Sequence, residues 1–209
     1  MLKTLLLGAS AAVALTGTVE ARGWYVSLEA GANWVADTDA VYREPGLAFT
    51  LPTEGTFDNG WALVAAVGYA LQNWRIEGEV AWRSNDKEQF IVGGPSTGSL
   101  DELTIMYNMT YQLPLGQGVG LALGGGGGLD HAMLDIPNID DNDLNFAFQG
   151  IVQLNYALSP DTELTLGYRY LHVLDPEFED RIPATTIEAN FEAFSKHALT
   201  IGVRYTFAP

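Results

Sequence analysis

The feature that most constrains this sequence is a series of segments in which apolar residues alternate with polar or small ones. In segment 74–84, for example, Ile76 and Val80 alternate with the charged residues Arg75 and Glu79. Alternation with period two puts successive side chains on opposite faces of a β-strand. Eight segments show the pattern, at residues 23–35, 60–71, 74–84, 102–113, 119–130, 144–158, 163–173 and 194–207. The sequence therefore predicts an all-β fold with one apolar and one polar face.

The connections between these segments alternate in length. Short turns at 72–73, 114–118 and 159–162 follow every second segment, and long connections fall at 36–59, 85–101, 131–143 and 174–193. Short turns on one side and long loops on the other are typical of outer-membrane barrels. We therefore expect a closed, antiparallel, up-and-down transmembrane β-barrel of eight strands. Ten strands remain an alternative, because 186–194 also alternates and the first or last long loop could hold an extra hairpin.

The N-terminal stretch predicts export. Lys3 precedes an apolar run at 5–15, and Val19-Glu20-Ala21 resembles a cleavage site. We expect residues 1–21 to be a signal peptide and 22–209 to form the barrel domain. No later segment is apolar enough for a membrane helix, and only helices and closed barrels satisfy every backbone group in lipid. The predicted location is the outer membrane of a Gram-negative bacterium.

Aromatic residues cluster near the ends of the segments, as expected at the two membrane–water boundaries. The predicted periplasmic girdle consists of Trp24, Tyr69, Trp74, Tyr111, Tyr156 and Tyr205. The predicted outer girdle consists of Trp34, Trp61, Trp82, Phe146 and Tyr170. A soluble sandwich or lipocalin-like barrel is the rival fold, but it would have to bury these rings in a lumen that barely holds side chains.

The polar face carries charges of both signs. Charged groups in a narrow interior must be paired, because an isolated buried charge is costly. We therefore predict an ion-paired lumenal network that plugs the barrel; its alternative is a gate whose pairs exchange partners and admit ions. The predicted members are Glu29, Arg75, Glu77, Glu79, Arg83, Glu102, Arg169, Lys196 and Arg204.

The long connections are acidic, with Arg43, Lys87 and Arg181 as the few bases among many carboxylates. The net charge of −16 argues against a nucleic-acid partner, which needs a basic face. No cofactor or firm metal site is predicted. Asp140, Asp141 and Asp143 are the best candidates for divalent-cation binding, although the run lacks the glycine and distal glutamate of an EF-hand loop.

Ser195 and His197 form a possible catalytic pair in the last segment, with Glu192 nearby. A nucleophile needs a positioned base and a third orienting group, which spacing alone does not supply. We therefore expect no catalytic residues, and a lipid A-modifying outer-membrane enzyme is only a remote alternative.

The first strand Gly23-Trp24-Tyr25-Val26, the eight-segment layout and the last strand at 199–207 resemble the small outer-membrane β-barrel family. This family includes the transmembrane domain of outer-membrane protein A and the opacity-type surface proteins. The resemblance implies that Phe207 is the terminal aromatic signal read by the barrel-assembly machinery.

The function expected from these features is structural or interactive: envelope integrity, adhesion or display of a surface antigen. The expected partners are outer-membrane lipids, lipopolysaccharide and the barrel-assembly machinery, with divalent cations or host and surface ligands at the loops. A narrow channel for ions or small apolar solutes is the alternative.

Overall fold

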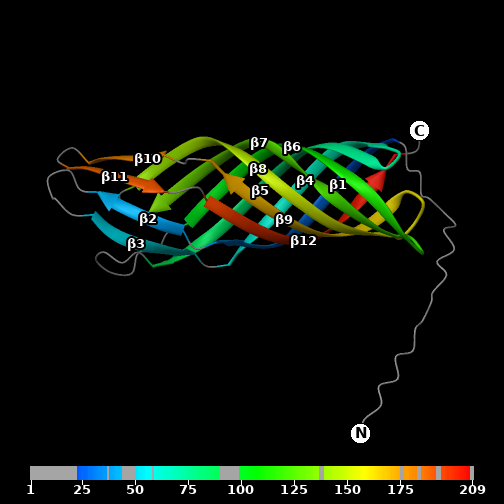
Figure 1. The fold of residues 1–209 in the computed structure, drawn as a ribbon, viewed down its shortest axis with the longest axis horizontal. Helices are drawn as coiled ribbons and strands as arrows, with labels where there is room; N and C mark the ends of the chain where they lie inside the picture. The colour runs from blue at the N-terminus through cyan, green and yellow to red at the C-terminus, as the bar shows by residue number, and fades with distance from the viewer. Residues whose placement is uncertain are drawn as a thin grey trace, which may run out of the picture.

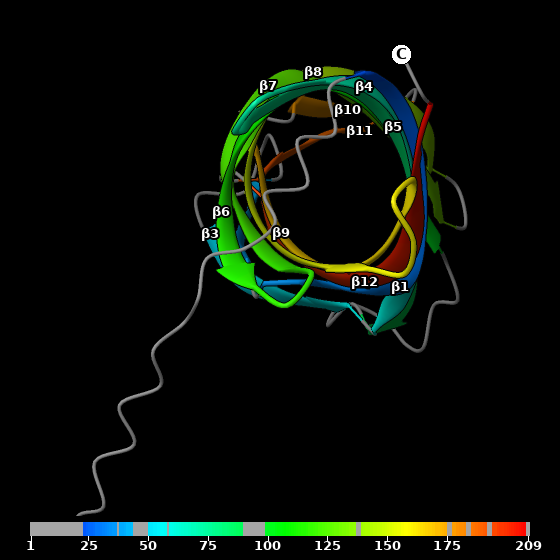
Figure 2. The same cartoon turned by 90° about the vertical axis from the view of Figure 1, so that its right-hand side faces the viewer.

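The computed structural model describes residues 23–36, 38–43, 50–57, 59–89, 99–136, 139–174, 177–182, 185–191 and 194–207. Long antiparallel strands wind around a closed wall, which appears as a ring when viewed along its axis (Figures 1 and 2). No helix in this described part is long and apolar enough to cross a membrane. The wall strands are β1 (Gly23–Val35), β4 (Gly60–Leu71), β5 (Trp74–Gln89), β6 (Ser99–Gly116), β7 (Val119–Ile136), β8 (Ile139–Ala157), β9 (Thr162–Val173) and β12 (Phe194–Thr206).

Each wall strand pairs antiparallel with the wall strands before and after it in the chain. The last strand, β12, pairs with β1 from Tyr25↔Thr206 to Val35↔Lys196, which closes the ring. Closure gives every wall strand a paired neighbour on both sides, as a barrel in lipid requires. The prediction of a closed eight-stranded antiparallel barrel is confirmed.

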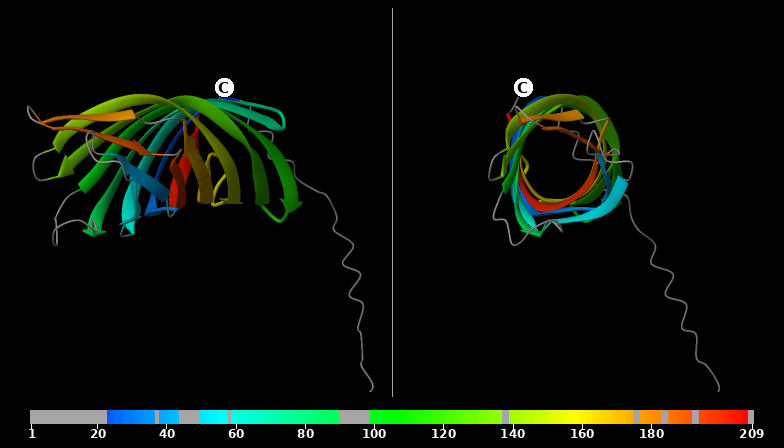
Figure 3. Two further views of the ribbon diagram at one scale, coloured as in Figure 1. Left: turned by 60° about the vertical axis from the view of Figure 1, so that its left-hand side comes forward. Right: turned by 90° about the vertical axis from the view of Figure 1, so that its left-hand side faces the viewer.

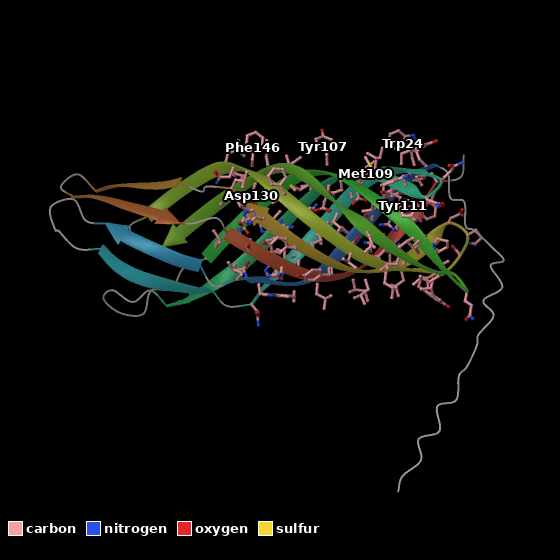
Figure 4. All side chains as sticks on the ribbon, in the orientation of Figure 1. Trp24, Tyr107, Met109, Tyr111, Asp130 and Phe146 are labelled. Carbon is pink, nitrogen blue, oxygen red and sulfur yellow. The ribbon has the colours of Figure 1, made fainter. Side chains whose placement is uncertain are left out.

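The two faces of the wall differ in polarity as the alternation predicts. Large apolar side chains face outward, including Tyr107 and Phe146, which are 75% and 68% exposed. Figure 4 shows Trp24, Tyr107 and Phe146 projecting from the wall. Charged side chains on the other parity are buried inside, such as Glu29 and Arg169 at 1% and 2% exposure. A soluble barrel would have the opposite polarity, so this alternative is wrong.

Four short strands extend the barrel at the end away from the described C-terminus (Figures 1 and 3). They are β2 (Thr38–Arg43), β3 (Thr50–Phe57), β10 (Glu177–Ile182) and β11 (Thr185–Phe191). They form two hairpins that pair with each other through β2 and β11, and β3 joins them to the end of β5. The first and last long connections therefore both contain a hairpin, yet the closed wall keeps eight strands.

The prediction of a long loop at 131–143 is wrong. Strand β7 continues to Ile136 and β8 begins at Ile139, with register pairs such as Asp135↔Asp140. Continuation of the ladder gives the backbone groups of this acidic stretch hydrogen-bond partners that a loop would lack. The backbones of Asp140, Asp141 and Asp143 therefore lie in a strand, and their side chains are outside the described part.

Candidate functional site

The lumen holds a polar network, and its central residue is Arg169 on β9. The Arg169 guanidinium donates to Glu29 Oε2 on β1 at 2.7 Å and to Glu79 Oε2 on β5 at 3.3 Å. Thr200 on β12 donates to the same Glu29 oxygen at 2.7 Å. A single buried cation thus serves two buried carboxylates from strands far apart in the sequence. Such charge-assisted hydrogen bonds are stronger than neutral ones.

Neutral amides continue the network toward β6 and β8. Gln153 donates to Glu29 Oε1 at 2.7 Å, and Gln149 donates to Glu79 Oε1 at 3.1 Å. Asn108 donates to Glu79 Oε2 at 3.0 Å, and its own carbonyl oxygen accepts from Gln149 at 2.7 Å. The amides therefore satisfy carboxylate lone pairs that the arginine does not reach.

A second charged group lies toward the short turns, around Glu163 near the start of β9. Arg75 donates to both Glu163 oxygens at 2.9 Å, and Arg204 donates to Oε2 at 3.0 Å. Arg204 also donates to Gln153 at 2.6 Å, which joins this group to the Arg169 cluster. The hydrogen bonds therefore run without interruption from Glu163 to Glu79.

Tyr25 on β1 packs against both arginines that bond to Glu163. Its ring centroid lies 5.8 Å from the Arg75 guanidinium carbon and 5.1 Å from that of Arg204. The Tyr25 hydroxyl donates to Glu77 Oε2 at 2.8 Å, and Glu77 also accepts from Asn108 at 3.3 Å. Both cations therefore gain a favourable contact with the ring face, and Glu77 is held by neutral donors.

The outer part of the lumen holds a third group. Lys196 on β12 pairs with Glu102 on β6, and Arg83 on β5 donates to Thr104 at 2.9 Å. Asp130 on β7 is fully buried, and neither of its oxygens has a hydrogen-bond partner among the described residues. Polar groups in this part of the lumen are thus less completely paired than those around Arg169.

Glycines and alanines make room for these bulky groups. All inward positions of β4, and those of β7 as far as Gly128, carry small or apolar residues, for example Ala66, Gly68 and Gly126. A Cβ on Gly126 would overlap the Asn108 carboxamide oxygen, and one on Gly167 would lie 2.9 Å from Arg169 Nη1. The glycine run at 124–128 is therefore part of the wall, where missing side chains leave space for the network.

All nine charged residues that the sequence assigns to the lumen are buried there, but their partners differ from a simple set of pairs. Glu163, which is not in the predicted set, pairs with two of the arginines. Glu77 and Arg83 form no ion pair within 4 Å among the described residues and bond neutral groups instead. Glu163 shares the parity of Thr165 and Arg169, and this signal could have identified it.

Aromatic side chains contact one another at the short-turn end. Trp24 packs edge-on against Tyr69, with ring centroids 5.4 Å apart, and Trp74 packs against Tyr111 at 4.9 Å. In both cases the two residues are register partners on adjacent strands. Phe207, the last described residue, packs against Tyr205 at 5.3 Å. Two of these contacts therefore join adjacent strands, and the third lies within the last strand.

Ser195 and His197 do not bond to each other. The Ser195 hydroxyl lies 2.8 Å from the Tyr170 hydroxyl and 3.2 Å from His172 Nδ1, and His197 Nδ1 lies 2.7 Å from the Tyr168 hydroxyl. The sequence alone gives His172 no evident partner, because Ser195 lies on the adjacent strand β12. Glu192, proposed as the nearby acid, lies outside the described residues.

An apolar exterior, a closed eight-stranded wall and a charged interior define an outer-membrane β-barrel protein. The sequence matches the family model for the outer membrane protein beta-barrel domain over residues 2–207, so the chain belongs to this family. It is located in the outer membrane, like the porin-like surface barrels of Gram-negative bacteria that it resembles. A search of curated protein sequences finds no match.

Solved structures of small outer-membrane barrels share the fold. Neisserial surface protein A has a TM-score of 0.57 and 19% identity, covering 88% of this chain and 97% of its own. The outer membrane protein OprG from Pseudomonas aeruginosa has a TM-score of 0.63 and 14% identity, covering 91% and 100%. The outer membrane protein AlkL has a TM-score of 0.57 and 13% identity, covering 100% and 98%. At these identities the likeness concerns the fold alone.

Proposed function

We propose that this protein is a non-enzymatic structural and surface-interaction protein whose lumen is sealed by its polar network. The uninterrupted hydrogen bonds from Glu163 through Arg204, Gln153, Glu29 and Arg169 to Glu79 carry this proposal. The barrel then serves as a rigid support that presents its acidic outer hairpins for envelope integrity, adhesion or antigen display.

The energetics of the network favour a sealed lumen. A solute-sized opening would separate Arg169 from Glu29 or Glu79, both nearly inaccessible to solvent. Breaking a buried pair by removing one partner typically costs about 3–5 kcal/mol, because the remaining charge is uncompensated. An eight-stranded barrel has no spare width to hydrate such a charge.

Planar-bilayer recording of the refolded protein tests this proposal. The wild type is expected to give no discrete, reproducible conductance steps. A Glu29→Ala/Arg169→Ala variant, which removes the central pair, is expected to give small steps, and the lipid-facing control Ile201→Ala is expected to stay silent. Reproducible steps from the wild type would contradict a sealed lumen.

A narrow channel for ions or small apolar solutes is the second candidate. The incompletely paired outer group favours it, because the buried Asp130 carboxyl has no hydrogen-bond partner among the described residues and is free to accept one. If the pairs exchange partners, Asp130→Asn should change the conductance or ion selectivity of the wild type. A silent wild type would exclude the ion channel.

We further propose the remaining assignments that follow from the sequence. Residues 1–21, which lie outside the described part, would direct export and be removed, and Phe207 would be read by the barrel-assembly machinery.

Asp140, Asp141 and Asp143 would bind divalent cations near anionic lipopolysaccharide. Release of acyl chains from lipid A that is lost in Ser195→Ala would contradict the non-enzymatic role.

A further inference from the structure

A group of polar and aromatic side chains interrupts the apolar exterior of the barrel on one side. The members occupy outward-facing positions of β1, β9 and β12, near the end that bears the short hairpins. We call this group the outer polar cluster; it consists of Trp34, Tyr168, Tyr170, His172, Ser195 and His197.

The cluster is held together by hydrogen bonds and ring contacts across three strands. Tyr168 bonds to His197 Nδ1 at 2.7 Å, and Ser195 bridges Tyr170 and His172 Nδ1 at 2.8 and 3.2 Å. The Trp34 and His197 rings stack, with centroids 5.6 Å apart and planes inclined by 14°. These polar groups are therefore oriented by one another.

The height of the cluster places it at the outer boundary of the membrane. On β12, Tyr205 lies at the periplasmic girdle and is followed outward by Val203, Ile201, Leu199 and then His197. A strand rises about 3.3 Å per residue, and a tilt of about 40° puts His197 roughly 20 Å above Tyr205 and Ser195 roughly 25 Å above it. The apolar band of such barrels is about 25 Å tall. The cluster thus lies where the headgroups of the outer leaflet begin.

At the same height, the outward side chains of the other strands are mixed in polarity and include Trp61, Trp82, Ser84 and Asp101 on β4, β5 and β6. Leu103, Leu144 and Phe146 occupy outward positions on β6 and β8, and the last two are 60% and 68% exposed. His131 on β7 has Leu103 and Leu144 as its register partners. The outer polar cluster differs from these positions because hydrogen bonds and ring contacts join its side chains across β1, β9 and β12.

The chemistry of the cluster suits a ligand rich in hydrogen-bond acceptors. Hydrogen bonds inside the cluster use Nδ1 of both imidazoles. When Tyr168 and Ser195 donate these bonds, the Nε2 atoms of His172 and His197 carry the protons and add two N–H donors to that of the Trp34 indole. Phosphates, ester and amide carbonyls are acceptors, and aromatic rings pack on the faces of sugar rings.

We propose that the outer polar cluster is a binding site for the phosphorylated sugar headgroup of lipopolysaccharide. This outer-leaflet lipid combines sugar rings, phosphates and acyl carbonyls at the height of the cluster. The inference goes beyond the sealed-barrel role and is independent of it, because the cluster lies on the lipid side of the wall and the network on the other.

Binding of fluorescent deep-rough lipopolysaccharide to the refolded protein in neutral detergent micelles tests the inference. We expect the Tyr168→Phe/Ser195→Ala variant, which keeps the rings and removes the hydroxyls that orient both imidazoles, to bind about tenfold more weakly, as expected for two lost hydrogen bonds. The His172→Leu/His197→Leu variant should lose at least as much. Heat modifiability on gels verifies that each variant is folded.

The control His131→Leu removes a histidine at a similar height on another strand and should bind like the wild type. Equal weakening by His131→Leu would show a general boundary effect and overturn the proposal. Equal competition by phosphatidylglycerol would show attraction to any anionic lipid and would also overturn it. Release of fatty acid from the lipid that is abolished by Ser195→Ala would show that the cluster hydrolyses this lipid, and it would overturn the proposal of a binding site.

Discussion

At the scale of single residues, the lumen depends on Arg169. Its guanidinium joins Glu29 on β1 to Glu79 on β5. The sequence places all three residues on the inward parity but does not show which carboxylates share the arginine. The sharing makes Arg169 the residue whose loss leaves two buried carboxylates without their cation.

Replacement of Arg169 by methionine should therefore be strongly destabilising. We expect the free energy of unfolding to fall by about 3–5 kcal/mol, measured by urea titration in lipid vesicles, because Glu29 and Glu79 remain buried and lose the guanidinium that bonds to both. The double variant Arg169→Met/Glu29→Gln should lose less than the sum of the two single variants, because the carboxamide that replaces the Glu29 carboxylate carries no charge. Additive losses would contradict coupling, and the lipid-facing control Leu199→Met should change stability by less than about 1.5 kcal/mol.

At the scale of elements, each wall strand separates two environments that require opposite residue types. Strand β12 shows this clearly, with Leu199, Ile201 and Val203 outward and Thr200 and Arg204 buried inside. Because Ile201 lies about 13 Å along the strand from Tyr205, its height is roughly 10 Å, near the middle of the apolar band. The loss of stability caused by a charged substitution should then depend on whether the position faces lipid, and not only on how exposed it is.

A matched pair of substitutions separates these two effects. Ile201 and Leu158 are both 57% exposed, but Leu158 follows β8 at the short-turn end. Ile201→Arg should lower the free energy of unfolding by about 2–4 kcal/mol and Leu158→Arg by about 0–1 kcal/mol, because the cost of a lipid-facing charge depends on depth. Urea titration in vesicles measures both, and equal losses would contradict the assigned membrane position.

At the scale of the whole molecule, the two ends of the barrel differ. At one end, short turns such as the one at Asp161 connect the wall strands, and at the other end the paired hairpins β2–β3 and β10–β11 extend the barrel. Short turns lie on the periplasmic side of outer-membrane barrels. The hairpins should therefore be outside the cell.

Cysteine labelling of intact cells tests this orientation without background, because the chain contains no cysteine. A membrane-impermeant maleimide should label Thr50→Cys on β3 and leave Asp161→Cys unlabelled until the outer membrane is permeabilised. Labelling of Asp161→Cys alone in intact cells would show that the barrel is inserted the other way.

The sequence by itself determined the strands, their faces and the closed barrel, because strand periodicity is local and lipid demands an apolar exterior and complete backbone pairing. The alternation at 74–84 is enough to put Arg75 and Glu79 on one face and Ile76 and Val80 on the other. The strand ends were less well determined by the sequence, because a polar stretch such as 139–143 can either continue a β-strand or form a loop.

Only the tertiary structure decided which residues meet. Glu163 lies 88 residues from Arg75 and bonds to it, and Thr200 lies 171 residues from Glu29. Ring closure and the offset between strands set these contacts, and neither is encoded in the local pattern. The same reason explains why His172 had no evident partner in the sequence: Ser195 becomes its neighbour only when β9 pairs with β12.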